Sequence, residues 1–259
     1  MTHPATETEQ PLAPYRPGED AIRLGGARTA VFTDLHLDPI APDEIHAFAI
    51  SLLPLAGGCD QLVILGDLFE SYVGREDFLH PAFGPMLQAF EHLRQNGTEI
   101  VLIRGNRDVL LSRGDGQHLN LTIADAVRVP GIEGDVLLTH GDAFCLADLP
   151  YQRLRRILRF PGMRPLLRAL PHGLRCRLAQ RLRNHSKQEV ARKPLDSMSL
   201  TLGQVDQVML KEGVQTAWIG HLHAAASHDL TGGGHLRVLP AWEPGTAALW
   251  IQDSLDETA

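Results

Sequence analysis

The chain has 259 residues, of which 44% are hydrophobic and 21% are charged, and its formal net charge is −7. This composition is typical of a globular protein and argues against a disordered, fibrous or disulfide-rich chain. The three cysteines are widely spaced and form no CxxC pair, which argues against a disulfide framework and against a thiolate zinc site. We therefore expect a reducing, cytoplasmic compartment. The sequence has neither about eighteen consecutive apolar residues nor a basic start followed by an apolar core, so we expect no transmembrane span and no secretory signal.

Short apolar runs alternate with amphipathic stretches from residue 29 onward. Residues 1–28 are polar and proline-rich, so we predict a flexible N-terminal tail followed by one domain over residues 29–259. Strands are predicted at 29–33, 61–65, 99–103, 135–139, 215–219, 236–239 and 247–251. Helices are predicted at 42–53, 85–96 and 196–212. This alternation predicts an α/β sheet protein with helices on the faces of its sheet.

Side chains that bind metal ions follow each of the first five predicted strands within a few residues. The motifs are Asp34-x-His36, Gly66-Asp67, Gly105-Asn106-Arg107-Asp108, His140-Gly141-Asp142 and Gly220-His221-Leu222-His223. Sites in open α/β sheets form just beyond the carboxyl ends of strands, so these scattered residues can converge. Each motif by itself is more typical of a turn, a helix cap or a structural histidine. Their joint occurrence favours a metal site.

The donor types indicate which metal chemistry to expect. Carboxylates, an amide oxygen and imidazoles without a thiolate suit Mn²⁺, Fe or Zn²⁺, and we expect Mn²⁺. The seven candidate ligands are Asp34, His36, Asp67, Asn106, His140, His221 and His223. Seven ligands exceed the needs of one ion, so we predict two ions that share a bridging carboxylate. Paired ions of this kind activate a water for phosphoryl displacement, and phosphoester hydrolysis is therefore the predicted chemistry.

The motif order DLH, GD, GNRD, HGD and GHLH resembles that of the calcineurin-like metallophosphoesterases, and it spans Asp34 to His223. The resemblance implies a two-sheet β-sandwich flanked by helices, with a two-metal site at its rim. It also implies that one ion is held by Asp34, His36, Asp67 and His223. The other ion would be held by Asp67, Asn106, His140 and His221, so that Asp67 bridges the two.

Four longer stretches resemble a narrower family, the UDP-2,3-diacylglucosamine diphosphatases (hydrolases) of lipid A biosynthesis. They are LVILGDLFESYVG, GNRDVLL, LTHGDAFC and RLRNHSKQE. The resemblance implies cleavage of UDP-2,3-diacylglucosamine to 2,3-diacylglucosamine 1-phosphate and UMP, by an enzyme bound peripherally to the cytoplasmic face of the inner membrane. The positions that match substrate contacts of the family are Asn106, Arg107, Asp148, Ser186, Lys193 and His221, and the implied catalytic residues are Asp67, Asn106, Arg107 and His221. The chain departs from the family pattern at Val190, Ala224–Ala225 and Glu243.

Residues 149–190 interrupt the alternation and are predicted to form an inserted helical cap. Residues 149–188 carry ten arginines and Lys187 but no Asp or Glu, and leucines recur among them at helical spacing. Prolines divide the stretch into short helices. A solvated arginine-rich face over a core-packing stripe is one interpretation. The unbalanced positive charge instead favours an anionic partner.

The kind of anionic partner depends on what accompanies the arginines. Nucleic acid needs aromatic side chains for stacking, and this stretch contains only Tyr151 and Phe160, so we expect no nucleic acid. Basic helices with a leucine stripe suit an anionic membrane surface or acyl chains, and an acylated UDP-sugar would use both properties. Two other functions stay open. One is hydrolysis of another nucleotide diphosphate or phosphodiester, and the other is a non-catalytic scaffold of the same fold, which the intact ligand set disfavours.

Overall fold

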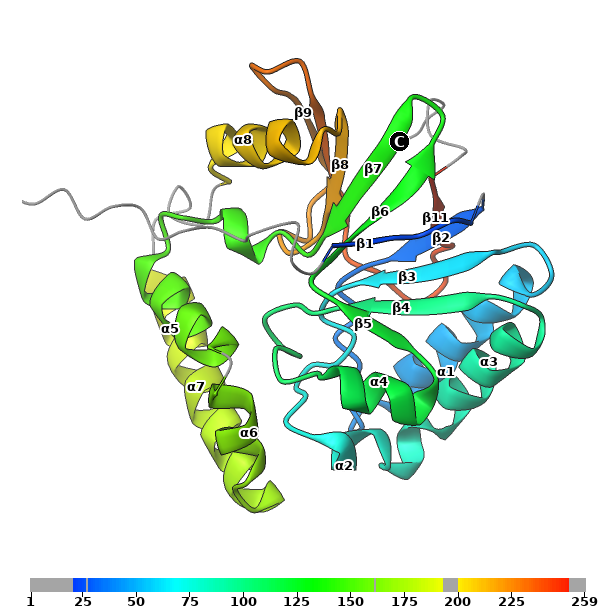
Figure 1. The fold of residues 1–259 in the computed structure, drawn as a ribbon. Helices are drawn as coiled ribbons and strands as arrows, with labels where there is room; N and C mark the ends of the chain where they lie inside the picture. The colour runs from blue at the N-terminus through cyan, green and yellow to red at the C-terminus, as the bar shows by residue number, and fades with distance from the viewer. Residues whose placement is uncertain (1–20, 27, 161, 193–199, 252–259) are drawn as a thin grey trace, which may run out of the picture.

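Two β-sheets pack face to face at the centre of the molecule, and helices cover their outer faces (Figure 1). The computed structural model describes residues 21–26, 28–160, 162–192 and 200–251, and the side chains of 184–192 are not described. The predicted two-sheet architecture flanked by helices is therefore confirmed.

The five-stranded sheet has the order β11-β2-β3-β4-β5. Its strands are β2 (Thr29–Phe32), β3 (Gln61–Leu65), β4 (Glu99–Ile103), β5 (Thr122–Ala124) and β11 (Leu249–Trp250). Strands β2 to β5 are parallel, and β11 pairs antiparallel with β2. The carboxyl ends of β2, β3 and β4 consequently meet at one edge of this sheet.

The six-stranded sheet is mixed and has the order β1-β6-β7-β8-β10-β9. Its strands are β1 (Ala21–Arg23), β6 (Ala126–Gly131), β7 (Gly134–Thr139), β8 (Thr216–Ile219), β9 (Ala226–Asp229) and β10 (His235–Val238). Strand β7 is parallel to β8, whereas β6 and β9 run antiparallel to their neighbours β7 and β10. The ends of β7 and β8 therefore lie side by side.

Eight α-helices are described. They are α1 (Pro42–Leu52), α2 (Arg75–Phe78), α3 (Gly84–Gln95), α4 (Arg113–Leu119), α5 (Leu149–Arg159), α6 (Met163–Arg168), α7 (His172–Arg192) and α8 (Leu202–Glu212). Three short 3₁₀ turns are η1 (Leu53–Leu55), η2 (Pro81–Phe83) and η3 (Asp142–Phe144). Helices α1 and α3 cover the five-stranded sheet, and α8 covers the six-stranded one.

Strand β3 illustrates why the sheets stack. Alternate side chains point to opposite faces of a strand, and in β3 both sets are buried and, apart from Gln61, apolar. Leu62 and Ile64 join the core beneath α1 and α3, whereas Val63 and Leu65 join the core between the two sheets. A strand that is buried on both faces reads as one continuous apolar run, so QLVIL is predictable from sequence.

Two expectations about segment boundaries need correction. Residues 21–23, inside the predicted tail 1–28, form β1 and pair with β6, from Ala21 opposite Ala126 to Arg23 opposite Arg128. Residues 1–20 lie outside the described residues. The predicted helix 196–212 begins at Leu202 in the described chain, after 193–199, which are outside it. Strand β1 was missed because three residues are too few to show a hydrophobic periodicity, and because its partner β6 is distant in sequence.

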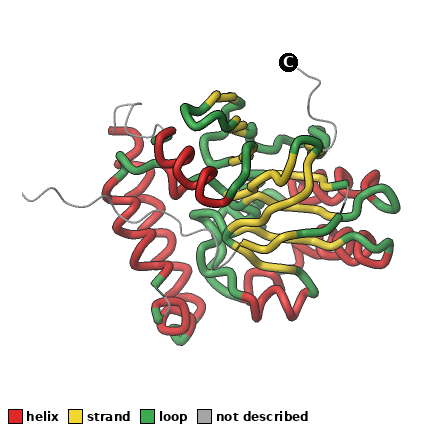
Figure 2. Tube along the Cα trace, turned by 45° about the horizontal axis from the view of Figure 1, so that its top comes forward, coloured by secondary structure: helices red, strands yellow, loops and turns green. Residues whose placement is uncertain are grey.

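The helices α5, α6 and α7 form the predicted insertion between η3 and α8. They stand beside one another at one side of the sheets, as the helices at the left of Figure 2 show. Pro171 lies between α6 and α7, whereas Pro165 lies inside the first turn of α6, where a proline is tolerated. None of the described helices is long and apolar enough to span a membrane.

Candidate metal centre

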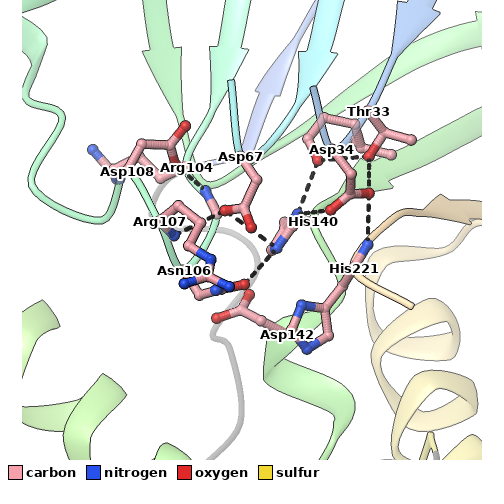
Figure 3. A network of polar contacts seen from close by, with 12 residues as sticks. Thr33, Asp34, Asp67, Arg104, Asn106, Arg107, Asp108, His140, Asp142 and His221 are labelled. Atoms are coloured by element: carbon pink, nitrogen blue, oxygen red, sulfur yellow. Dashed lines mark hydrogen bonds and ion pairs between the residues drawn. The ribbon is translucent and has the colours of Figure 1, made fainter. Parts of the chain in front are cut away.

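The seven candidate ligands come together where the two sheets meet. Asp34, His36, Asp67 and Asn106 follow β2, β3 and β4 of one sheet, and His140, His221 and His223 follow β7 and β8 of the other. Figure 3 shows His140 between the carboxylates of Asp34 and Asp67, with the amide of Asn106 beside its ring. The site is thus built from both sheets, and neither sheet holds it alone.

One group of ligand atoms gathers around Asp34. The Nε2 atoms of His36 and His223 face each other at 3.1 Å, and Asp34 Oδ1 lies 3.4 Å from His223 Nε2 and 4.0 Å from His36 Nε2. Asp34 Oδ1 is buried and has no hydrogen-bond partner among the described residues. Two imidazole nitrogens and an orphaned carboxylate oxygen aimed at one point form an arrangement that suits a cation.

A second group gathers around His140. Its Nδ1 lies 3.0 Å from the carbonyl oxygen of Leu65, at the end of β3, and this contact turns Nε2 toward the centre. His140 Nε2 lies 3.0 Å from Asn106 Oδ1 and 3.7 Å from Asp67 Oδ1. The backbone N–H of Arg107 donates to the same Asp67 oxygen at 2.9 Å. The donors here are again nitrogen and oxygen atoms, as hard or borderline metal ions require.

His221 completes the cluster from the six-stranded sheet. Its backbone N–H donates to Asp34 Oδ2 at 2.8 Å, and its ring packs against those of His140 and Tyr151. Burial, together with the positive charge of His140, lowers the pKa of His221 to about 4. The imidazole is therefore neutral at pH 7, which is the state that binds a metal ion.

The backbone at the site is strained in a consistent way. Five of the seven candidate ligands have positive φ angles between 50° and 71°, a region that costs a side-chain-bearing residue free energy. They are Asp34, His36, Asp67, His221 and His223. The only other non-glycine residue with positive φ in the described chain is Asn120. Such strain persists where the surrounding structure enforces it, and it concentrates at functional sites.

Two glycines in the motifs make room for ligands from neighbouring strands. A Cβ atom on Gly105 would lie 2.0 Å from Asp67 Oδ1, and one on Gly66 would lie 2.3 Å from His140 Nδ1. Gly66 also has a φ of 89°, which disfavours any side chain. These glycines are required by close packing around the ligands.

The carboxylates give the centre a negative potential. Burial alone would lower the pKa of His140, but Asp67, Asp34 and Asp142 raise it to about 9. Burial alone would raise the pKa of Asp34, yet His223, His140 and the Thr33 hydroxyl bring it well below its usual range. The centre therefore attracts positive charge, which a bound divalent ion would supply in place of the proton on His140.

Asp108 links two of the ligand loops. Its carboxylate accepts hydrogen bonds from Leu68 N at 3.0 Å and from Gly105 N at 2.6 Å, so the loops carrying Asp67 and Asn106 are joined. Burial and the nearby charge of Asp67 raise the pKa of Asp108 to about 7. The GNRD motif thus contains the candidate ligand Asn106 and also Asp108, which fixes the loop that carries Asp67.

An apolar pocket opens beside the metal centre, beneath the insertion. Asn106 and Arg107 form part of its wall, together with Glu70, Tyr151 and Arg183. The remaining wall is mostly apolar and includes Tyr72, Val73, Val109, Leu110, Leu154, Leu158, Leu167, Leu178, Ala179 and Leu182. Part of the predicted leucine stripe therefore faces this pocket, whereas Ile157 and Leu174 of that stripe are about half exposed, at 52% and 49%.

The arginines of the insertion are not the unbalanced surface that the sequence indicates. Five of them pair with carboxylates of the sheet-bearing part of the chain. The pairs are Arg155–Asp142 at 2.7 Å, Arg159–Asp125 at 2.5 Å, Arg168–Asp115 at 2.6 Å, Arg175–Glu76 at 2.6 Å and Arg183–Glu70 at 3.3 Å. These five arginines are thus neutralised by carboxylates outside the insertion, and the pairs anchor the insertion along its length.

Known relatives match most of the chain, although no protein-family model does. The UDP-2,3-diacylglucosamine hydrolase of Pseudomonas syringae pv. tomato is 38% identical over 201 residues, which are 77% of this chain and 81% of the relative. Its namesake from Pseudomonas fluorescens is 37% identical over 227 residues, which are 86% of this chain and 90% of the relative. The chain belongs to the UDP-2,3-diacylglucosamine hydrolase family. The predicted class of enzyme, a hydrolase, is thereby confirmed.

Solved structures are less similar than these members of the UDP-2,3-diacylglucosamine hydrolase family. A dimetal phosphatase from Danio rerio aligns over 85% of this chain and 90% of its own length, at 11% identity and a TM-score of 0.43. A likeness this weak supports no statement about activity.

The substrate positions implied by the UDP-2,3-diacylglucosamine hydrolase family are only partly described. Asp148 caps α5, where its Oδ1 accepts a hydrogen bond from Tyr151 N at 3.2 Å. Ser186 lies in α7, but its side chain is outside the described part of the structure, and Lys193 is outside it entirely. Asn106, Arg107 and His221 lie at the metal centre, and the first two also line the pocket.

Sequence reasoning missed several residues that support the site. Thr33 donates to Asp34 Oδ2 at 2.6 Å, and the Tyr151 hydroxyl donates to Asp142 Oδ2 at 2.5 Å. Glu70 lies against His36, as described below. Thr33 is adjacent to a ligand and was within reach of sequence reasoning. Tyr151 carried no motif signal. Glu70 lies within the stretch LVILGDLFESYVG, but the sequence does not connect it with His36, because that contact is known only once the chain has folded.

Proposed function

We propose that this protein hydrolyses the diphosphate of UDP-2,3-diacylglucosamine, releasing 2,3-diacylglucosamine 1-phosphate and UMP. The names of its curated relatives support this substrate. The observation that carries the proposal is the apolar pocket whose wall includes Asn106 and Arg107 of the candidate metal centre. A substrate with two acyl chains and a diphosphate needs an apolar surface beside a polar, cationic centre.

The cofactors are two divalent ions, for which we propose Mn²⁺. Asp34, His36, Asp67 and His223 would hold one ion, and Asp67, Asn106, His140 and His221 would hold the other. The buried, unpartnered Asp34 Oδ1 and the facing nitrogens of His36 and His223 support this assignment. Bound ions of this kind supply an activated water and stabilise charge on the phosphoryl oxygens.

Arg107 binds the diphosphate in this proposal. Its Nε is buried without a hydrogen-bond partner, and within the described chain it forms no ion pair with Asp108 or Asp142. Those carboxylates are instead engaged by backbone N–H groups and by Arg155. A planar guanidinium near the metal centre whose Nε forms no hydrogen bond within the described chain suits two phosphate oxygens.

The insertion provides the acyl site and the contact with the membrane. Leucines on α5, α6 and α7 line the pocket. Ile157, Phe160 and Leu166 of the insertion are more than half exposed, and Arg156 and Arg177 of the same insertion are also exposed. An outer face with apolar and cationic side chains suits the anionic surface of a membrane, and we place it at the cytoplasmic face of the inner membrane.

The decisive experiment compares acylated and deacylated substrates. Each buried methylene is worth about 0.8 kcal/mol, so UDP-2,3-diacylglucosamine should be hydrolysed with a kcat/KM at least about 10³-fold above that for UDP-N-acetylglucosamine. Equal efficiency on the two substrates would contradict the lipid substrate.

Two matched variants on α7 locate the acyl site. Leu178→Asp places a charge in the pocket wall, whereas Leu174→Asp places one on the same helix at a position that does not line the pocket. The preference for the acylated substrate should fall in the first variant and persist in the second. Melting temperatures of both variants show whether either effect comes from unfolding. If the two folded variants showed the same preference for the acylated substrate, the acyl site would have to lie elsewhere.

A further inference from the structure

His36 and His140 both turn Nε2 toward the metal centre, but their other ring nitrogens are held by different kinds of group. His140 Nδ1 lies 3.0 Å from the main-chain carbonyl of Leu65, so its orientation is fixed by β3 itself. His36 Nδ1 is buried and meets the hydrogen-bond criteria with no described residue, but the Oε2 atom of Glu70 lies within ion-pair distance, 3.3 Å away. The orientation of His36 therefore depends on a side chain.

The insertion in turn holds Glu70 in place. Arg183 of α7 donates from Nη2 to the main-chain carbonyl of Glu70 at 2.7 Å, and its Nη1 lies 3.3 Å from Glu70 Oε1. Contacts to both the backbone and the side chain leave the Glu70 carboxylate little freedom. Its other oxygen faces His36, so a continuous chain of contacts runs from α7 to a candidate ligand.

We propose that Glu70 is a positioning residue for the metal centre and that Arg183 acts through it. The proposal rests on the proposed function, because it takes His36 as a ligand of the ion shared with Asp34 and His223. A carboxylate beside Nδ1 fixes the tautomer in which Nε2 carries the lone pair, and it makes that nitrogen more basic. The insertion thereby sets the affinity of one metal position, in addition to covering the pocket.

Another anchor of the insertion provides a matched control. Arg168 pairs with Asp115 at 2.6 Å and also donates to Ser112. Among the described residues, neither Arg168 nor Asp115 contacts any of the seven candidate ligands. Loss of Arg168 therefore tests whether weakening the insertion alone alters metal binding.

The experiment is a calorimetric titration of the full-length, metal-free protein with Mn²⁺. The wild type should show two binding events. Glu70→Gln should weaken one event by about tenfold or more and leave the other unchanged, as is typical when the partner of a metal-bound histidine is removed. Arg183→Gln should weaken the same event by a smaller factor. Because Arg183 acts through Glu70, the double variant should lose no more affinity than Glu70→Gln alone.

The outcomes separate this inference from the function on which it rests. Fewer than two binding events in the wild type would overturn the two-metal function. Two wild-type events with unchanged affinities in Glu70→Gln and Arg183→Gln would overturn the positioning role alone. An equal loss of affinity in Arg168→Gln would also overturn it, because that result would assign the effect to general loosening of the insertion. Melting temperatures establish that each variant is folded.

Discussion

The metal centre and the helical insertion relate to the sequence in opposite ways. Each candidate ligand lies within four residues of the end of a buried strand, so a local motif identifies it. The insertion shows a large local excess of arginine, but its charge balance is decided by carboxylates far away in sequence. Arg183, for example, pairs with Glu70, and Arg175 pairs with Glu76.

The difference shows which property of a segment can be read locally. The residue type determines which donor atoms a ligand offers, and the end of the preceding strand predicts where that residue lies in the fold. Electrostatic potential is a sum over neighbours in space, so the composition of one segment does not determine it. The insertion therefore packs partly against the rest of the chain, and its paired arginines attach it there whether or not an outside partner binds.

The largest expected effect concerns the shared carboxylate of the metal centre. Asp67→Asn should lower kcat by at least about 10³-fold and reduce bound Mn²⁺, because both proposed ions lose a negatively charged ligand. Turnover with saturating substrate and metal analysis of the purified variant measure the two effects. Asp43→Asn, an exposed carboxylate on α1, should change neither. If Asp67→Asn retained full activity, the assignment of Asp67 as a shared metal ligand from its sequence motif would be wrong.

A second effect concerns the attachment of the insertion. Asp125 pairs with Arg159 and Arg104, and all three side chains are nearly buried. Asp125→Asn should lower the free energy of unfolding by about 3–5 kcal/mol, because it removes the carboxylate paired with buried Arg104 and leaves Arg159 with only the more distant Asp142, at 4.0 Å. Urea unfolding measures this loss. Arg177→Gln, at an exposed position on α7, should change stability by no more than about 0.5 kcal/mol.

The stabilisation that Asp125 contributes should also depend on pH, in a predictable direction. Burial raises the pKa of Asp125, but Arg159 and Arg104 outweigh it and hold that pKa well below its usual range. The stabilisation from this carboxylate is therefore fully present above an unfolded pKa of about 3.9 and is lost as the pH falls further. Wild type and Asp125→Asn should differ at pH 7 and converge in strong acid. A difference independent of pH would point to a steric effect of the substitution.

A smaller effect tests whether Arg107 belongs to the metal centre or to the internal ion pairs. Arg107→Lys should reduce kcat by about 10- to 100-fold and leave Mn²⁺ content and melting temperature unchanged, because an ammonium cannot bind two phosphate oxygens in a fork. Steady-state kinetics with the acylated substrate measure this loss. Arg156→Lys, at an exposed position on α5, is the control and should behave as wild type. A loss of stability without a loss of turnover would make Arg107 a structural arginine.

Much of the sheet architecture was predictable because its strands are buried on both faces. Residues 62–65 of β3 are one continuous apolar run, and the boundaries of β3 agree with the prediction. Strand β6 reads AVRVPG, where an arginine, a proline and a glycine obscure the pattern, and β1 has three residues. Strand β1 pairs with β6, which is distant in sequence, and β6 pairs with β7 across a short turn, so both strands depend on their partners and show little periodicity of their own.

The candidate ligands were also predictable, because each lies in a short motif at the end of a buried strand. The residues around them were not predictable. Asp67 and His140 each stand in a motif with glycine, and the structure gives that glycine a steric role. Glu70 stands three residues after Asp67, within the stretch LVILGDLFESYVG, but the sequence assigns it no partner. Its importance comes from contacts with His36 and with Arg183, which pattern reading does not connect.

The left-handed backbone at five candidate ligands places folding stability and activity in conflict. At a position such as His36 or His223, glycine adopts this conformation without strain, whereas a histidine costs on the order of 1 kcal/mol or more. Drift under selection for stability alone would therefore replace these histidines and remove the metal centre while the two-sheet core remained intact. The positive φ angles of these five residues therefore mark positions whose side chains fit a function better than they fit the needs of stability.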